Sequence, residues 1–171
     1  MTERVIFSFS HLKELKQHAS NFDMTIGELS IRRFPDKERY LRCLTDVQGK
    51  EVILYESMYD PDPNFLTWIY FAECVKSMGA KSIGLIAPYL AYMRQDKMFN
   101  PGECLTSKVF AELISKHFNW LITMEPHLHR YKALKEVYSI PAKNVHATKA
   151  IADKLNSMGD IYLVGPDEES R

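Results

Sequence analysis

Short apolar segments alternate with longer amphipathic ones through the middle of this chain, and this alternation restricts its fold more than any other feature. Three of the short segments are typical of buried strands, and they comprise Glu51–Glu56, Ser82–Ala87 and Trp120–Met124. Between them, residues 62–78 and 105–118 repeat apolar side chains at the spacing of an amphipathic helix. Strands joined by crossovers of this length pair in parallel, whereas hairpin loops are too short to allow it. We therefore predict an α/β domain whose parallel sheet has helices on both faces.

The outer parts of the chain predict further elements. They are a strand at 4–10, a helix at 12–18, strands at 25–34 and 39–44, a helix at about 147–157 and a last strand at 161–165. Pro35 and Asp36 suit the central positions of a tight turn, so the strands around them predict an antiparallel hairpin at the edge of the sheet. In sheets of this type, ligands bind where loops leave the carboxyl ends of the strands. The loops of interest are therefore residues 88–103, 125–130 and 166–171.

The composition limits the partners that the chain can have. At 171 residues it is long enough for one domain and too short for two of ordinary size. Lysine plus arginine equal aspartate plus glutamate, 22 each, so the chain lacks the surplus positive charge that nucleic-acid and anionic-membrane binders use. No apolar run approaches the roughly 20 residues of a membrane span, and the three cysteines fit neither a disulfide framework nor a zinc site. We expect a cytoplasmic protein with neither nucleic acid nor a membrane as its partner.

Charged and polar side chains occupy the long loop after the second of the buried strands. Arg94 could stack on a nucleotide base, Gln95 could hydrogen-bond the edge of the base, and Lys97 could neutralise a phosphate. Loops longer than about 12 residues are usually functional or disordered. A solvated, charged loop without a ligand is therefore an equal alternative.

Histidine and carboxylate side chains follow two other strands. Glu125, His127 and His129 come after the third buried strand, where imidazole and carboxylate groups could hold a metal ion or a phosphate. Exposed histidines at the start of a helix are the alternative. Asp167 follows the last predicted strand and could either hold magnesium beside phosphates or cap a helix.

The tip of the predicted hairpin carries a third group. Phe34 could stack on adenine while Asp36 and Glu38 accept hydrogen bonds from its amino group, and a turn with exposed charges is the alternative. The chain contains neither GxxxxGKS/T nor GxGxxG, so the sequence supports no Walker-type or Rossmann nucleotide site.

Four segments, in this order, resemble the N-terminal half of ribose-phosphate diphosphokinase, the phosphoribosyl pyrophosphate (PRPP) synthetase family. They are Phe34–Glu38 (FPDKE, similar to the family's FSDGE), Pro88–Lys97 (PYLAYMRQDK, similar to PYxxYARQD followed by Arg or Lys), Ile122–His127 (ITMEPH, similar to ITMDLH) and Val164–Asp167 (VGPD, similar to VSPD). The resemblance runs from about Gly27 to Asp167, and the second segment is the most specific. It implies a phosphoribosyltransferase-like parallel sheet with an antiparallel edge hairpin. It also implies transfer of the β,γ-diphosphoryl group of ATP to the 1-hydroxyl of ribose 5-phosphate.

The resemblance further implies which residues act. By position it assigns to ATP the side chains Phe34, Asp36, Lys37, Glu38, Arg94 and Gln95. Phe34, Asp36 and Glu38 would reach the adenine from a neighbouring subunit, so the resemblance predicts a homo-oligomer, from a dimer to a hexamer. His127 and Asp167 would lie beside the triphosphate and bind magnesium, with His127 as the catalytic side chain. These residue types suit the chemistry, because displacement at phosphorus depends mainly on positioning and on cations that neutralise charge.

The chain also departs from the family pattern. Lys37 replaces a glycine, so the hairpin tip must avoid a left-handed backbone or accept strain. Glu125 replaces an aspartate, and neither Glu125 nor His129 receives a role from the resemblance. The family's second domain supplies the ribose 5-phosphate site and a basic catalytic flap, and residues 1–171 contain neither. We therefore expect a single N-terminal domain, an inactive fragment that retains weak ATP binding; the alternative is a non-catalytic, PRPP synthetase-associated regulatory or interaction module.

Overall fold

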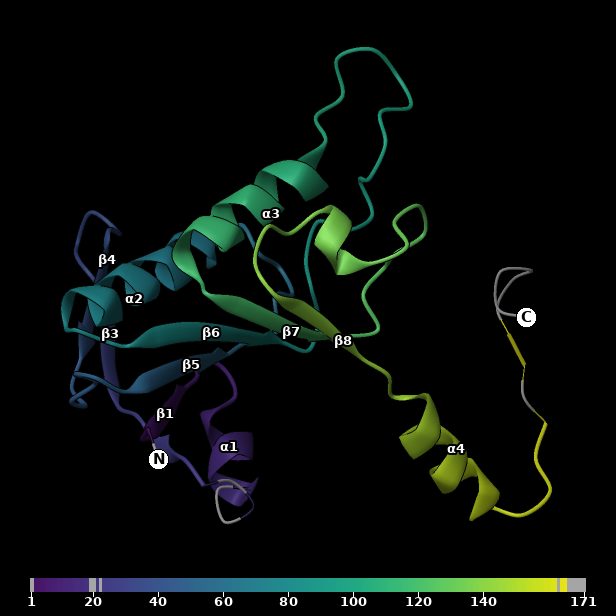
Figure 1. The fold of residues 1–171 in the computed structure, drawn as a ribbon, viewed down its shortest axis with the longest axis horizontal. Helices are drawn as coiled ribbons and strands as arrows, with labels where there is room; N and C mark the ends of the chain where they lie inside the picture. Colours follow the sequence, from purple (N-terminus) through teal and green to yellow (C-terminus); the bar gives the residue numbers. More distant parts are fainter. Residues whose placement is uncertain (1, 19–20, 22, 163, 166–171) are drawn as a thin grey trace.

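In the described part of the chain, six parallel strands form the main sheet, in the order β2-β1-β5-β6-β7-β8 (Figure 1). These strands are β1 (Arg4–Phe7), β2 (Thr25–Ile26), β5 (Glu51–Tyr55), β6 (Ser82–Ala87), β7 (Trp120–Met124) and β8 (Ala142–Val145). The helices of the described residues are α1 (Leu12–His18), α2 (Phe65–Ser77), α3 (Thr106–His117), the 3-10 helix η2 (Leu134–Glu136) and α4 (Thr148–Asn156). None of these helices is long and apolar enough to cross a membrane. The structure is a computed structural model that describes residues 2–18, 21, 23–162 and 164–165. The predicted α/β fold with a parallel sheet is confirmed.

Helices lie on both faces of the sheet (Figure 1). Phe7, Leu54 and Leu85 are fully buried on the face that α2 and α3 cover. Ile53 belongs to the opposite face, where Leu15 of α1 packs against it. Burial of each such side chain contributes about 1.5–3 kcal/mol, so both layers stabilise the fold.

A two-stranded antiparallel hairpin, β3 (Leu29–Arg33) with β4 (Arg39–Cys43), lies beside α2. The hairpin is confirmed, but the single strand expected over 25–34 is wrong, because the chain leaves the main sheet after β2 and the next strand pairs with β4. Gly27 lies at this break. A Cβ atom at Gly27 would lie 2.1 Å from Cε1 of Phe7, so only glycine fits where the chain passes the Phe7 ring.

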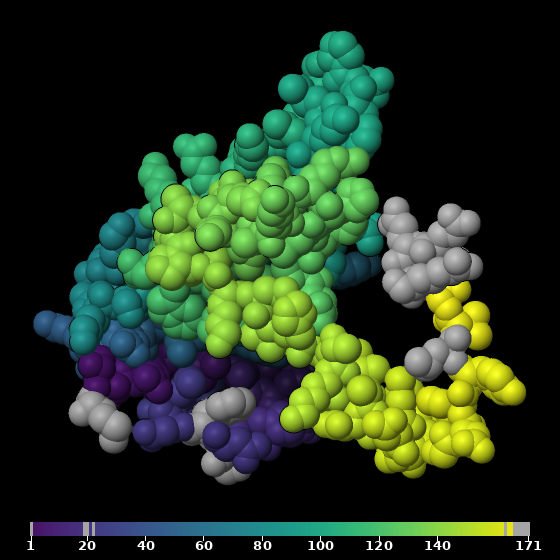
Figure 2. All heavy atoms as spheres, turned by 45° about the vertical axis from the view of Figure 1, so that its right-hand side comes forward, coloured from purple at the N-terminus to yellow at the C-terminus, as the bar shows by residue number. Residues whose placement is uncertain are grey.

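The C-terminal part of the chain departs from the expected pattern. β8, which the sequence did not predict, pairs in parallel with β7, and beyond it α4 projects from the body of the molecule (Figures 1 and 2). No residue of α4 is buried. The strand expected at 161–165 is wrong for the residues described there, since Tyr162 and Val164 are 98% and 90% exposed and lie in no strand. A strand requires a hydrogen-bonded neighbour, and no described strand pairs with this segment.

Candidate functional site

A cavity of about 560 Å³ opens at the carboxyl ends of β6 and β7. The loop after β6 lines it with Tyr89, Leu90, Met93 and Arg94. β7 contributes its last residue, Met124, and the loop after it contributes Glu125, Pro126, His127, Leu128 and His129. Adjacent parallel strands bring their carboxyl ends to one edge of a sheet, which is where ligands bind in folds of this class. The structure thus brings together Arg94 and His127, two of the residues predicted from the sequence.

The loop after β6 is held in a defined conformation that leaves Arg94 exposed. Gln95 Oε1 accepts a hydrogen bond from Thr106 Oγ1 at 2.8 Å. Tyr92 has a left-handed backbone, with φ at 59°, and its hydroxyl donates to Asp62. Such a conformation costs a non-glycine residue of order 1–3 kcal/mol and persists only where the surroundings hold it. Among the described residues, the Arg94 guanidinium has no hydrogen-bond or ion-pair partner, and the amide N–H groups of Gln95 are also available.

Glu125 begins the second loop and directs its carboxylate to the start of α4. Its φ is 42°, again left-handed for a residue with a side chain. Oε1 accepts hydrogen bonds from the Ala147 N–H at 2.9 Å and from Thr148 Oγ1 at 3.5 Å, and Oε2 lies 3.2 Å from His146 Nδ1. The Ala147 N–H and, to a smaller extent, the His146 ring lower the pKa of Glu125 below its usual value. The Glu125 carboxylate is therefore engaged at the junction of β8 and α4.

His127 and His129 contribute two imidazole rings to the cavity. The ring centroids are 5.9 Å apart and the planes are inclined by 23°, a stacked arrangement. Both residues are exposed, and neither ring has a hydrogen-bond partner in the part of the chain that the structure describes. The same part holds no group of three or more His, Cys, Asp or Glu side chains that could bind a metal ion. A metal ion here would need other ligands, such as the oxygens of a bound phosphate.

The residues predicted at the hairpin tip lie elsewhere. Phe34 is 39% exposed and meets Tyr40 edge-on, with ring centroids 6.0 Å apart, and the Arg32 guanidinium lies 4.6 Å from the centroid of the Phe34 ring. Asp36 Oδ1 accepts a hydrogen bond from the Glu38 N–H at 3.1 Å, which shapes the turn. Phe34, Asp36 and Glu38 do not line the cavity. Within one chain, the hairpin tip and the cavity are separate parts of the surface.

Two residues near the cavity were not predicted to act. Asp96 and Arg130 form an ion pair of 2.9 Å that joins the two loops. Asp96 lies in the most specific of the four segments, yet the sequence gives no indication of its partner, which is 34 residues away. Asp167, the predicted magnesium ligand, lies outside the described residues.

Comparison with known proteins identifies the family. A sequence profile of the N-terminal domain of ribose phosphate pyrophosphokinase matches residues 4–117. The chain belongs to this family. Ribose-phosphate pyrophosphokinases of Methanothermobacter thermautotrophicus and Methanopyrus kandleri are 27% and 31% identical to it, over 88% and 90% of this chain and 52% and 53% of their own lengths. The chain thus spans about half the length of these curated relatives.

A solved structure of a ribose-phosphate pyrophosphokinase homologue has the same fold. The crystal structure of phosphoribosylpyrophosphate synthetase from Mycobacterium smegmatis matches with a TM-score of 0.79 at 21% sequence identity, over 91% of this chain and 52% of that chain. This likeness confirms the predicted fold class, and the profile confirms the family predicted from the four segments.

Lys37, where the pyrophosphokinase family resemblance places a glycine, has a left-handed backbone with φ at 73°. Its N–H donates to the carbonyl of Phe34 at 2.9 Å, and the Phe34 N–H donates to the carbonyl of Glu38 at 2.9 Å. Hairpins of this kind place a left-handed residue after the turn. The conformation costs a residue with a side chain roughly 1–2 kcal/mol. Of the two outcomes that the sequence allowed, avoiding a left-handed backbone or accepting strain, the hairpin tip shows the second.

Proposed function

We propose that this chain is the ATP-binding part of a ribose-phosphate diphosphokinase, which as a whole transfers the β,γ-diphosphoryl group of ATP to the 1-hydroxyl of ribose 5-phosphate. The observation that carries the proposal is that Arg94 and His127, from two different loops, line one cavity at the carboxyl edge of the sheet. The cavity volume of about 560 Å³ falls within the range of small-molecule sites. Membership of the family supports the same assignment.

Arg94, which lines the cavity, and Gln95, which follows it in the chain but is not among the lining residues, would offer complementary contacts to an adenine ring. A guanidinium group is planar and stacks on aromatic faces. Gln95 Oε1 already accepts a hydrogen bond from Thr106, so the amide N–H groups are the part of Gln95 that can donate to a ring nitrogen. One contact would cover the face of the base and the other would fix its edge.

His127 would act on the triphosphate. Imidazole N–H groups donate hydrogen bonds to phosphate oxygens, and in-line displacement at phosphorus depends on donors and cations held in position. Magnesium would arrive with ATP, because proteins usually hold this ion through one or two carboxylates together with substrate phosphates. His127 and Asp167 are the protein ligands that we propose for it. The bound ion would supply positive charge where the phosphates carry negative charge.

The hairpin would complete the adenine site of a neighbouring copy. Phe34 is exposed, and the nearby Asp36 and Glu38 supply two carboxylates, but none of the three lines the cavity of its own chain. The site as we propose it is incomplete without them. We therefore include a homo-oligomer, a dimer or a larger assembly up to a hexamer, in the proposal.

Ribose 5-phosphate would bind elsewhere. The relatives are about twice as long as this chain, and the ribose 5-phosphate site would lie in the part of them that the chain does not span. We accordingly expect the 171-residue chain to bind ATP without turnover.

Calorimetric titration of the chain with MgATP tests the proposal. Arg94→Ala should weaken binding fivefold or more, because a stacked base is worth about 1–3 kcal/mol. Arg4→Ala is the control, since Arg4 is an exposed arginine at the opposite edge of the sheet and should leave the Kd unchanged. A wild-type chain that binds no MgATP, or an equal loss in both variants, would contradict the proposal.

A non-catalytic regulatory or interaction module of the same family is the second candidate. Glu125, which replaces a family aspartate, favours this candidate, because its carboxylate accepts a hydrogen bond from the Ala147 N–H. Such a module would bind a full-length ribose-phosphate diphosphokinase without needing ATP. Sedimentation of the chain mixed with the Methanopyrus kandleri relative separates the two candidates. A complex that forms equally well with Arg94→Ala, from a chain that binds no MgATP, would favour the module.

A further inference from the structure

Asp96 differs from its neighbours in the Arg94–Lys97 segment because its side chain is fully buried. Oδ1 accepts a hydrogen bond from Arg130 Nη1 at 2.9 Å. Oδ2 is also buried and has no hydrogen-bond partner among the described residues. A carboxylate in such surroundings is strongly unfavourable unless an opposite charge is paired with it. Arg130 is therefore the charged side chain that pairs with Asp96 in this position.

The ion pair joins the two loops that line the cavity. Asp96 lies two residues after Arg94, and Arg130 follows His129 directly. The adjacent Tyr131 hydroxyl donates to the carbonyl of Asp96 at 3.5 Å. Of the hydrogen bonds between described residues, these two connect residues 88–105 with residues 125–133.

Side-chain contacts around the pair extend the connection to the start of α3. The Tyr131 hydroxyl lies 3.4 Å from Ser107 Oγ, and Ser107 is buried. The Arg130 guanidinium also lies 5.2 Å from the ring centroid of Phe99, further along the first loop. Neither Asp96 nor Arg130 lines the cavity, so the pair has no direct contact to offer a ligand there.

We infer that the Asp96–Arg130 pair is a positioning device for the nucleotide site, which fixes Arg94 relative to His127 and thereby sets the width of the cleft between the two loops. This inference rests on the proposed function. A long loop loses conformational freedom when it grips a ligand, and a contact that orders the loop beforehand removes part of that cost from binding. Stacking of a guanidinium on a base also requires the two planes to be aligned, so a small displacement of Arg94 weakens the contact.

A pair that acts through Arg94 makes a specific prediction for a double-mutant cycle. We would measure the Kd for MgATP and the melting temperature of the wild-type chain, Arg130→Met, Arg94→Ala and the double variant. Arg130→Met should raise the Kd about three- to tenfold when Arg94 is present and less than twofold when it is replaced by alanine. The melting temperature should fall by the same amount in both backgrounds, because the cost of the unpaired Asp96 does not depend on Arg94.

Two further variants keep the test decisive if Arg130→Met unfolds the chain. Arg130→Lys retains the charge and should bind MgATP nearly as well as the wild type does. Asp96→Asn combined with Arg130→Met leaves no unpaired charge and should fold, yet should bind as weakly as predicted for Arg130→Met. Arg4→Met is the matched control, because Arg4 pairs with Glu51 at 3.0 Å on the exposed surface away from the cavity.

Amide hydrogen exchange without ATP measures the ordering of the loops independently of nucleotide binding. Arg130→Met should speed exchange in residues 93–97 and 127–131 and leave β1 and β5 as slow as in the wild type. Unchanged exchange, or an equal loss of MgATP affinity with and without Arg94, would overturn the positioning role alone. A wild-type chain that binds no MgATP would overturn the proposed function and, with it, the nucleotide role of the pair.

Discussion

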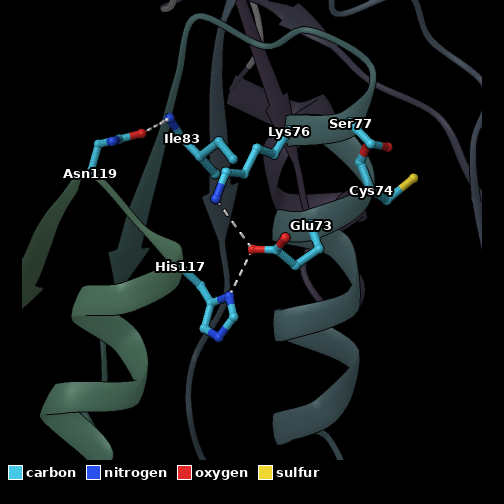
Figure 3. Close-up of polar contacts among 7 residues, drawn as sticks. All are labelled: Glu73, Cys74, Lys76, Ser77, Ile83, His117 and Asn119. Atoms are coloured by element: carbon cyan, nitrogen blue, oxygen red, sulfur yellow. Dashed lines mark hydrogen bonds and ion pairs between the residues drawn. The ribbon is translucent and has the colours of Figure 1, made fainter.

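Polar side chains have different surroundings at the two ends of the parallel strands, which we call the amino edge and the carboxyl edge of the sheet. At the amino edge, where α2 and α3 end and β6 and β7 begin, polar groups bond to one another (Figure 3). Glu73 Oε1 lies 2.9 Å from His117 Nδ1 and 3.7 Å from Lys76 Nζ. Asn119 Oδ1 accepts a hydrogen bond from the backbone N–H of Ile83 at 2.7 Å. These contacts connect α2 with α3 and β6 with the start of β7.

At the carboxyl edge, contacts such as the Asp96–Arg130 ion pair hold the loops, but two of the polar side chains that line the cavity take no part in them. Arg94 and His127 have no hydrogen-bond partner among the described residues, although both line the cavity. Left-handed backbones at Tyr92 and Glu125 lie close to them in the sequence. Strain of this kind persists only where other contacts compensate for it, and it gathers at ligand sites. On the proposed function, this difference separates side chains that stabilise the fold from side chains that would contact the nucleotide.

Replacing His127 tests the carboxyl edge and has the largest expected effect. His127→Ala should weaken MgATP binding about tenfold or more, because a hydrogen bond to a charged group is worth about 1.5–3 kcal/mol. The melting temperature should stay within about 2 °C of the wild type, since the exposed ring stacks only on the exposed His129 and has no hydrogen-bond partner among the described residues. Calorimetric titration and thermal unfolding measure the two quantities. His18→Ala, an exposed histidine of α1, is the control, and a parallel loss of stability and affinity in His127→Ala would make the histidine structural.

Replacing Asn119 tests the amino edge and should give the reverse result. Asn119→Ala removes the acceptor of the partly buried Ile83 N–H, which costs about 1–3 kcal/mol of unfolding free energy. For a chain of this size the melting temperature should fall by about 2–4 °C for each kcal/mol, with the Kd for MgATP unchanged. Asn119→Asp keeps an acceptor oxygen and should restore most of the stability. Weakened nucleotide binding in Asn119→Ala would show that the two edges are not independent.

The strands of the sheet centre could be predicted because both of their faces are buried, which makes their sequences continuously apolar. β8, with the sequence Ala-Lys-Asn-Val, carries only two apolar residues and pairs with a single strand in the described part of the chain, so composition gave no strand signal. The break at Gly27 was also missed, since it depends on the position of the Phe7 ring twenty residues earlier. The segment at 161–165 was predicted as a strand from its local apolar pattern alone, but a strand also needs a neighbouring strand to pair with, and the local pattern does not report one.

In the candidate site, too, contacts that depend on residues far apart in the sequence could not be predicted. The meeting of Arg94 and His127 followed from topology, because loops after neighbouring parallel strands leave the same edge. The Asp96–Arg130 contact could not be predicted, since it joins two irregular loops whose paths no periodicity describes. A left-handed φ at Lys37 could be considered from the sequence because the resemblance places glycine there, but only the structure shows that Lys37 adopts it.

The contact between Glu73 and His117 supports the smallest prediction, a pH dependence of stability. The hydrogen bond from His117 is the main cause that lowers the pKa of Glu73, so between the folded and the ordinary pKa the unfolded chain binds more protons than the folded one. This contribution to stability is therefore present above the ordinary glutamate pKa, about 4.3, and is lost as pH falls through the lower pKa of the folded state. Glu73 is about half exposed, so solvent screening keeps the effect below about 1 kcal/mol.

Urea unfolding between pH 6 and pH 3 should give Glu73→Gln a flatter profile of stability against pH than the wild type has. Glu112→Gln, which replaces an exposed acid of α3, is the control and should follow the wild type. Equal profiles for wild type and Glu73→Gln would mean that the amino edge gains nothing from this contact.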